Sequence, residues 1–319
     1  MSRPEEQTTD RPLEELVVTA AEHHTRRRYE VRHVTSYAYE KEVTASYGRA
    51  CLRPRDTRQQ DIASHTTRVS PQPQVLEESE DFFGNFSHYI EITTPHTSLE
   101  VAKSSLIDVE WPTVDLAALN RWSVSEAAAA LPADPAVDAS EWGRYLLPSP
   151  LVTLEPEVRD YALTLAWPDR PLGQAIAAVT HEIWRDFRYD KTATSTRTTL
   201  PEVLAKRAGV CQDFAHLACA VFRAAGLPAR YVSGYIETTP PPGKVKLAGS
   251  DATHAWVSVM VPGGVWVDLD PTNNHLADSR YLVTAWGRDF RDVSPLKGVI
   301  FSEGGSSKLK VAVDVTRLD

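Results

Sequence analysis

Residues 207–236 read RAGVCQDFAHLACAVFRAAGLPARYVSGYI, and they carry the strongest structural signals of the chain. After Cys211, apolar side chains recur at a spacing of three or four residues, which predicts a helix buried on one side. These side chains are Phe214, Ala215, Leu217, Ala218, Val221 and Phe222. Gly226 and Pro228 end the helix, since glycine accepts the left-handed cap and proline cannot continue the hydrogen-bond ladder. Cys211 therefore lies in the first turn, where unpaired N–H groups and the helix dipole stabilise a thiolate.

The three cysteines of the chain are expected to behave differently. Free cysteines are usually buried and act as small hydrophobic side chains, which describes Cys219 inside the same predicted helix. Cys211 differs because a glycine stands two residues before it and because a histidine and an aspartate follow on predicted strands. This combination indicates a nucleophilic cysteine with partners for proton transfer.

Composition narrows the class of protein. The chain has 319 residues, enough for about two domains, and its net charge of −9 argues against a nucleic-acid partner. Three cysteines are too few for a disulfide framework and suit a reducing compartment. The first residues lack the apolar core of a signal peptide, and no apolar run approaches the length of a membrane span. We therefore expect a cytoplasmic protein with no membrane partner.

The chain divides into segments of different character. Short alternating runs separated by turn residues between 29 and 112 predict an antiparallel β-sandwich, so the fold class is α+β. Apolar periodicity after Pro171 predicts a long helix, and a short helix is expected over 201–207. The predicted organisation is a flexible tail with a short helix near 13–21 (1–28), the β-sandwich module (29–112), a connecting segment (113–150), a catalytic domain (151–295), and final strands that could complete either sheet (296–319).

A hairpin supplies the partners of Cys211. Residues 252–261 and 265–270 alternate between apolar and polar side chains around a Pro-Gly-Gly turn, which predicts two paired strands. If Val261 faces Val265, His254 and Asp270 lie on one face and are diagonal neighbours within hydrogen-bond reach. Two alternative partners for His254 are Asp268, one step farther along the strand, and Asp251, in the turn that enters the hairpin.

This arrangement predicts a chemical role for each residue. His254 accepts the Cys211 proton and later donates one to the leaving amine, while Asp270 fixes the orientation of the ring. The N–H of Cys211 is one expected oxyanion donor. Neither a Cys-x-x-Cys nor a His-x-x-x-His spacing is present, so no metal site is expected. Candidates for the second oxyanion donor or for support of the site are Tyr189, Gln212 and Trp256.

Four motifs resemble the bacterial transglutaminase-like superfamily: GVCQDFA (209–215), GLPARYVSGY (226–235), HAWV (254–257) and DPTN (270–273). Three more, HVTSYAY (33–39), LRPR (52–55) and DFFGN (81–85), resemble the amino-terminal domain that precedes such cores. Together the resemblance spans roughly residues 29–315. It implies a papain-like α+β fold, a cysteine-bearing helix packed on an antiparallel sheet, and no cofactor. The family's nucleophile, histidine and aspartate fall on Cys211, His254 and Asp270. Asp268 is a departure, because the family often has a smaller residue there.

The resemblance leaves the reaction open, since one fold can host several chemistries. Thiolate attack on an amide gives a thioester, which water hydrolyses and an amine converts into a new amide. The first expectation is hydrolysis of a peptide or protein-like substrate by a protease or amidase. Acyl transfer to an amine is the alternative, and a non-catalytic binding module is a third reading. The sequence does not indicate an oligomeric state.

Overall fold

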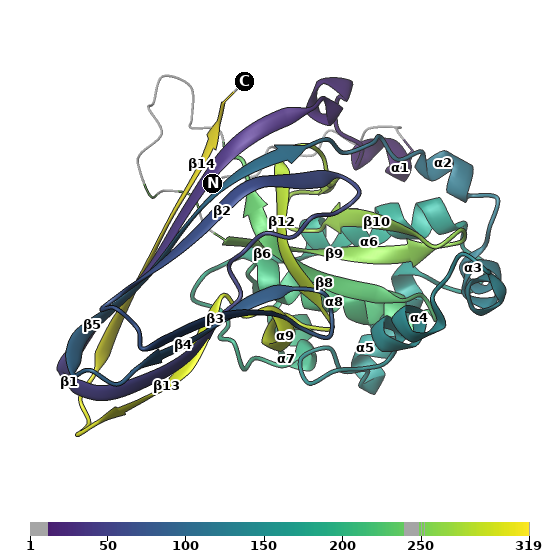
Figure 1. The fold of residues 1–319 in the computed structure, drawn as a ribbon. Coiled ribbons are helices and arrows are strands. Elements are labelled where there is room, and N and C mark those ends of the chain that lie inside the picture. The colour runs from purple at the N-terminus through teal and green to yellow at the C-terminus, as the bar shows by residue number, and fades with distance from the viewer. Residues whose placement is uncertain (1–11, 239–248, 250, 252, 319) are drawn as a thin grey trace, which may run out of the picture.

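The computed structural model describes residues 12–238, 249, 251 and 253–318, in which a curled β-sheet adjoins a helix-covered sheet (Figure 1). We call the curled sheet, which includes the strands at the end of the chain, the N-terminal module. The helix-covered part, residues 113–295, is called the core domain. The arrangement agrees with the α+β class expected from the sequence.

The N-terminal module is organised around one 24-residue strand, β1. Its first half pairs with β5 and β14, and its second half pairs with β4 and β13. The strands of the module are β1 (Arg27–Ala50), β2 (Gln60–Ser70), β3 (Val75–Glu80), β4 (Phe86–Ile92), β5 (His96–Val109), β13 (Leu296–Ser302) and β14 (Ser307–Arg317). Apolar side chains from the strands that pair with the two halves of β1, such as Ile90 of β4 and Val101 of β5, form one buried cluster. The two faces of the expected sandwich are therefore formed by one antiparallel sheet that curls back on itself.

The final strands complete the N-terminal module. Leu296 of β13 lies opposite Ala50, and Arg317 of β14 lies opposite Tyr29, both in antiparallel register with β1. The sequence left open which sheet these strands join. The chain thus returns from the core domain to the sheet in which it began.

The core domain contains a five-stranded antiparallel sheet in the order β11-β10-β9-β8-β12. Its strands are β8 (Ala229–Ile236), β9 (Thr253–Val261), β10 (Val265–Asp270), β11 (His275–Leu276) and β12 (Tyr281–Gly287). Val261 pairs with Val265 and Val257 with Leu269, so the predicted hairpin register is confirmed. This register fixes which side chains share a face with His254.

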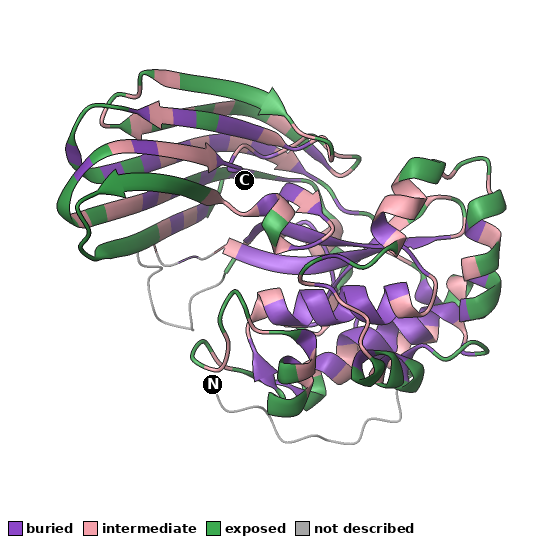
Figure 2. Cartoon of the chain, turned by 90° about the horizontal axis from the view of Figure 1, so that it is seen from below, coloured by how far each residue is buried: buried purple, intermediate pink, exposed green. Residues whose placement is uncertain are grey.

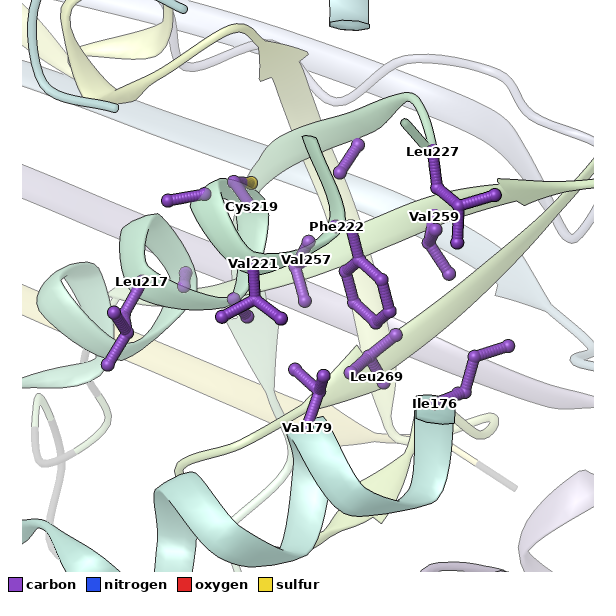
Figure 3. Packing of buried hydrophobic residues seen from close by; sticks show 14 of the residues in the cluster. Ile176, Val179, Leu217, Cys219, Val221, Phe222, Leu227, Val257, Val259 and Leu269 are labelled. Atoms are coloured by element: carbon purple, nitrogen blue, oxygen red, sulfur yellow. The ribbon is translucent and has the colours of Figure 1, made fainter. Parts of the chain in front are cut away.

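The helices that follow the connecting segment are α5 (Pro156–Leu165), α6 (Leu172–Asp186), α7 (Leu200–Lys206), α8 (Cys211–Ala224) and the short α9 (Phe290–Val293). Of these, α6, α8 and α9 contact the sheet, whereas α5 and α7 pack on α8. Helix α8 contacts β8 and β9, and Val221 and Phe222 lie among Val257, Leu269 and Val179 (Figure 3). Every residue of α8 from Asp213 to Arg223 is buried, so the expectation of a helix buried on one side only is wrong. Other elements also cover the face that carries His216 and Arg223, which form hydrogen bonds with Phe290 and Ala229.

The segments before the core helices are also packed. Helices α2 (Leu116–Leu119), α3 (Val124–Ala130) and α4 (Ala139–Leu146) occupy the connecting segment. In place of the single helix expected near 13–21, the structure has α1 (Leu13–Leu16) and a 3-10 turn (Ala21–His24). Val17 is fully buried, and its carbonyl accepts a hydrogen bond from the Leu276 N–H. The described part of the predicted flexible tail is thus ordered, whereas residues 1–11 lie outside the described residues.

Burial is uneven across the molecule. Figure 2 shows buried residues concentrated in the core helices and their sheet, whereas much of the N-terminal module is exposed. Strand β13 is exposed along nearly its whole length. Within the residues that the structure describes, no helix combines the length and the apolar character that crossing a membrane requires.

Candidate active site

Cys211 is the first residue of α8, and its position is fixed by contacts on both sides of the helix start. Asp213 is buried, and its Oδ2 accepts hydrogen bonds from the Val210 N–H at 2.8 Å and the Thr194 hydroxyl at 2.6 Å. A Cβ on Gly209 would lie 2.7 Å from the same carboxylate oxygen. Glycine at this position therefore lets Asp213 close against the helix start and hold Cys211 in place.

His254 and Asp270 meet across the β9–β10 hairpin. The distance between His254 Nε2 and Asp270 Oδ2 is 2.7 Å, and both side chains are at least nine-tenths buried. The Cys211 side chain lines the same cleft as the His254 ring and interacts with it closely enough to raise the pKa of His254. Because Nε2 is engaged by Asp270, Nδ1 is the nitrogen that remains for the sulfur. The structure thus brings together the three residues that the sequence predicted to work together.

Asp270 is held as a carboxylate by several donors. Its Oδ2 accepts from Asn273 Nδ2 at 2.6 Å and from the Tyr281 hydroxyl at 2.5 Å, and its Oδ1 accepts from the Thr272 N–H at 2.8 Å. Burial alone would raise the pKa of Asp270, but the His254 charge and these hydrogen bonds outweigh burial and hold the pKa well below its usual range. Asp270 is therefore ionised near neutral pH, where it pairs with His254.

Contacts with Asp270 and Cys211 set the charge of His254. Burial lowers the pKa of His254, but the Asp270 charge, the hydrogen bond to Asp270 and the contact with Cys211 outweigh burial and raise the pKa to about 10. The ring is therefore an imidazolium near neutral pH, and it places a positive charge beside the Cys211 sulfur.

Trp256 supports the histidine ring. The Trp256 and His254 rings are stacked, with centroids 6.2 Å apart and an interplanar angle of 26°. Trp256 Nε1 donates to Asp268 Oδ1 at 2.9 Å, so this N–H is already committed and does not serve as an oxyanion donor. Trp256 keeps only the supporting role that the sequence allowed.

The two alternative aspartates lie in other hydrogen-bond networks. Asp268 accepts from Trp256 and from the Ser258 hydroxyl at 2.9 Å, so it reaches His254 only through the indole ring. Burial raises the pKa of Asp268, and the nearby Arg230 guanidinium opposes that rise. Asp251 accepts from the Thr238 hydroxyl and from the Val315 N–H, which ties it to β14. The geometry therefore favours Asp270 as the partner of His254.

A cleft of about 600 Å³ opens beside Cys211 and His254. Tyr189 lines this cleft and is 48% exposed. Its strand, β6 (Arg188–Tyr189), pairs in parallel with β7 (Ala208–Gly209), which directly precedes the turn into Cys211. Gln212 is half-buried and is not part of the cleft lining. Tyr189 is thus placed beside the nucleophile, and its role as an oxyanion donor stays a prediction.

Two functional contacts were missed by sequence reasoning. Asn273 belongs to the quoted DPTN motif, and an asparagine so close to the aspartate could have indicated a local hydrogen bond. Tyr281 carries no such signal, because it reaches Asp270 from the start of β12, a strand at the opposite end of the sheet. Among the described residues, no group of three or more His, Cys, Asp or Glu side chains could hold a metal ion.

Two family models and several relatives match this chain. Residues 29–108 match the family described as the bacterial transglutaminase-like N-terminal region, and residues 159–271 match the transglutaminase-like superfamily. An uncharacterized protein of Mycobacterium tuberculosis is 42% identical over 296 residues, which cover 90% of this chain and 92% of the relative. An uncharacterized protein of Mycobacterium leprae is 30% identical over 296 residues, covering 91% and 99%.

A solved structure shares the fold. The crystal structure of a cysteine protease candidate from Cytophaga hutchinsonii superposes with a TM-score of 0.73 at 21% identity, covering 92% of each chain. Both the amino-terminal module and the core are therefore parts of one known architecture. The chain belongs to the transglutaminase-like superfamily.

Proposed function

We propose that this protein is a cysteine hydrolase that cleaves amide bonds of a peptide or protein-like substrate through a thioester. The observation that carries the proposal is the connected set Cys211, His254 and Asp270 beside an open cleft. Membership of the transglutaminase-like superfamily supports an enzyme with this nucleophile. A reducing compartment such as the cytoplasm, which we predict from the cysteine content, would keep Cys211 as a thiol.

The geometry supports a reaction in two stages, which are acylation of Cys211 and hydrolysis of the thioester. The Cys211 thiolate attacks the amide carbon, and the carbonyl electrons move onto the oxygen, which the Cys211 N–H stabilises. The His254 imidazolium gives its proton to the leaving nitrogen, the C–N bond breaks, and a thioester and an amine result. Neutral His254 then takes a proton from water, the hydroxide attacks the thioester, and the acid and Cys211 are released. Asp270 keeps the ring oriented throughout.

Acyl transfer to an amine is the second candidate. A stretch of 67 residues is 40% identical to part of a protein-glutamine gamma-glutamyltransferase from Pseudomonas aeruginosa, covering 21% of this chain and 10% of that protein. The first half-reaction would be the same, and an amine would replace water in the second. Access of water to the thioester in the cleft would decide between the two outcomes.

One experiment separates the candidates. The full chain is incubated with casein, with and without the amine monodansylcadaverine, and the products are identified by mass spectrometry. Hydrolysis gives new peptide termini or converts glutamine to glutamate, and acyl transfer gives dansyl-labelled glutamine. We expect hydrolysis products in both conditions.

The control is Cys211→Ala, which removes the sulfur and should abolish every product. If the parent protein forms no product and Cys211 does not react with iodoacetamide, the hydrolase proposal is wrong. A binding module that uses the N-terminal module as its contact surface would then be the better explanation.

A further inference from the structure

Strand β12 is an edge strand of the core sheet, yet side chains of the N-terminal module satisfy its outer backbone groups. Gln60 Nε2 donates to the Val283 carbonyl at 2.8 Å, and Gln60 Oε1 accepts from the Val283 N–H at 2.8 Å. Asn85 Nδ2 donates to the Trp286 carbonyl at 2.8 Å, and Asn85 Oδ1 accepts from the Trp286 N–H at 3.0 Å. Each carboxamide thus replaces the hydrogen-bond pair of a neighbouring strand.

The beginning of β12 is held from the same side. Trp111, which follows the last residues of β5, donates its indole N–H to the Tyr281 carbonyl at 3.1 Å. The Trp111 backbone N–H donates to the Ser279 hydroxyl at 3.0 Å. Gln60, Asn85 and Trp111 are all buried or nearly so. These contacts fix β12 along its length, because an unpaired buried backbone group would cost free energy if any of them were lost.

The residue that begins β12 reaches the candidate active site. The Tyr281 hydroxyl donates to Asp270 Oδ2 at 2.5 Å, the same oxygen that faces His254 Nε2. The Tyr281 ring is fully buried and packs edge-on against Trp256, with centroids 5.2 Å apart. Tyr281 also shares a hydrophobic cluster with Tyr29 and Val31 of β1. A continuous set of contacts therefore joins the N-terminal module to the Asp270 carboxylate.

We propose that the N-terminal module braces the candidate active site: Gln60, Asn85 and Trp111 fix β12, and β12 presents Tyr281 to Asp270. Tyr281 is a positioning residue that acts on Cys211 through Asp270 and His254. The inference rests on the proposed catalytic set, and it gives the amino-terminal motif ending in Asn85 a role in the reaction.

The physical consequence concerns the Asp270 carboxylate. Without the Tyr281 hydroxyl, Asp270 Oδ2 loses a donor that holds the carboxylate against the His254 ring. A carboxylate that can rotate away stabilises the imidazolium less, and a ring without its positive charge activates the Cys211 sulfur less. Loosening β12 by removing Gln60 displaces Tyr281 and has the same effect.

The test measures the alkylation of Cys211 by iodoacetamide in the full chain from pH 4 to pH 10. This reaction needs no substrate, so its result is independent of whether the protein hydrolyses, transfers or only binds. We expect Tyr281→Phe to slow alkylation at neutral pH about tenfold, the effect of losing a hydrogen bond to a charged group, and to move the rising limb to higher pH. Gln60→Ala should act in the same direction.

A double-mutant cycle tests whether the module acts through Tyr281. In the Tyr281→Phe background, Gln60→Ala should cause little further loss. If the two losses multiply, or if Gln60→Ala alkylates at the parental rate, the brace is refuted. Should Gln60→Ala not fold, Trp111→Phe replaces it, because this change removes the indole donor to the Tyr281 carbonyl and keeps an aromatic ring at the position.

Ser105→Ala is the matched control. Ser105 is a buried residue of β5 whose hydroxyl pairs with His65 Nδ1 at 2.8 Å inside the same module and not with a group of β12. This variant should lose thermal stability while Cys211 alkylates at the parental rate. Equal slowing in Ser105→Ala and Gln60→Ala would show that general loosening is responsible, which would also refute the brace.

Discussion

Burial distinguishes the three cysteines at the scale of single residues. Cys51 and Cys219 are 3% and 0% exposed, and burial raises the pKa of each to about 12. Cys211 lines the cleft and contacts the protonated His254. We therefore expect brief iodoacetamide treatment near neutral pH to label Cys211 first. Peptide mapping by mass spectrometry reads this out, and earlier labelling of either buried cysteine would contradict it.

The orientation of His254 depends on a single carboxylate. Asp270→Asn keeps the size of the side chain but removes the charge opposite Nε2, so we expect turnover to fall by about a thousandfold or more while the fold survives. Asp268→Asn and Asp251→Asn are the matched comparisons, because both are buried aspartates in other hydrogen-bond networks. A larger loss of turnover in either of them would overturn the assignment of Asp270.

Tyr189 is the candidate for the second oxyanion donor. Tyr189 lies beside Cys211 at the cleft, so its hydroxyl can reach an oxygen that develops charge there. If it does, Tyr189→Phe should cost about 3 kcal/mol of barrier, or about a hundredfold in turnover. Turnover within about threefold of the parent, together with unchanged thermal stability, would remove Tyr189 from the mechanism.

Among the secondary-structure elements, strands β8 and β12 approach each other closely at one glycine. Gly234 of β8 lies between His254 of β9 and Val283 of β12. A Cβ at this position would lie 2.0 Å from the Leu282 carbonyl oxygen and 2.8 Å from the Trp256 ring. Only glycine allows β8 and β12 to approach this closely while Trp256 covers them.

We expect Gly234→Ala to lower the free energy of unfolding by more than about 2 kcal/mol, because backbone atoms must move apart. The control is Gly143→Ala in α4, where a Cβ would meet no atom within 4 Å. That change should raise stability by up to about 1 kcal/mol, since alanine is the better helix former. Denaturant titration of both variants checks the prediction, and equal stability of the two would contradict it.

In the molecule as a whole, the N-terminal module and the core domain are joined by buried contacts. Arg27 forms an ion pair with Glu237 at 2.9 Å, and the Tyr29 hydroxyl donates to the same carboxylate at 2.6 Å. One hydrophobic cluster contains Val31 and Val313 of the module together with Val232 and Leu282 of the core. These contacts couple the folding of the module to that of the core domain.

We therefore expect the full chain to unfold in a single thermal transition. Calorimetry should give equal calorimetric and van't Hoff enthalpies, as for one cooperative unit. Arg27→Ala should lower the temperature of that one transition without splitting it. Two separate transitions in the parent protein would show that the module and the core fold independently.

Local patterns in the sequence were enough to predict the main features of the site. Apolar periodicity placed Cys211 at a helix start, and strand alternation around the Pro-Gly-Gly turn fixed the register that brings Asp270 to His254. These features could be predicted because helix and hairpin geometry depend on residues close together in the chain. Tertiary structure alone decided that β13 and β14 return to β1 and that Tyr281 holds Asp270. The pairing of Gln60 with Val283, 223 residues apart, arises only when both parts are folded, and no local pattern encodes such a contact.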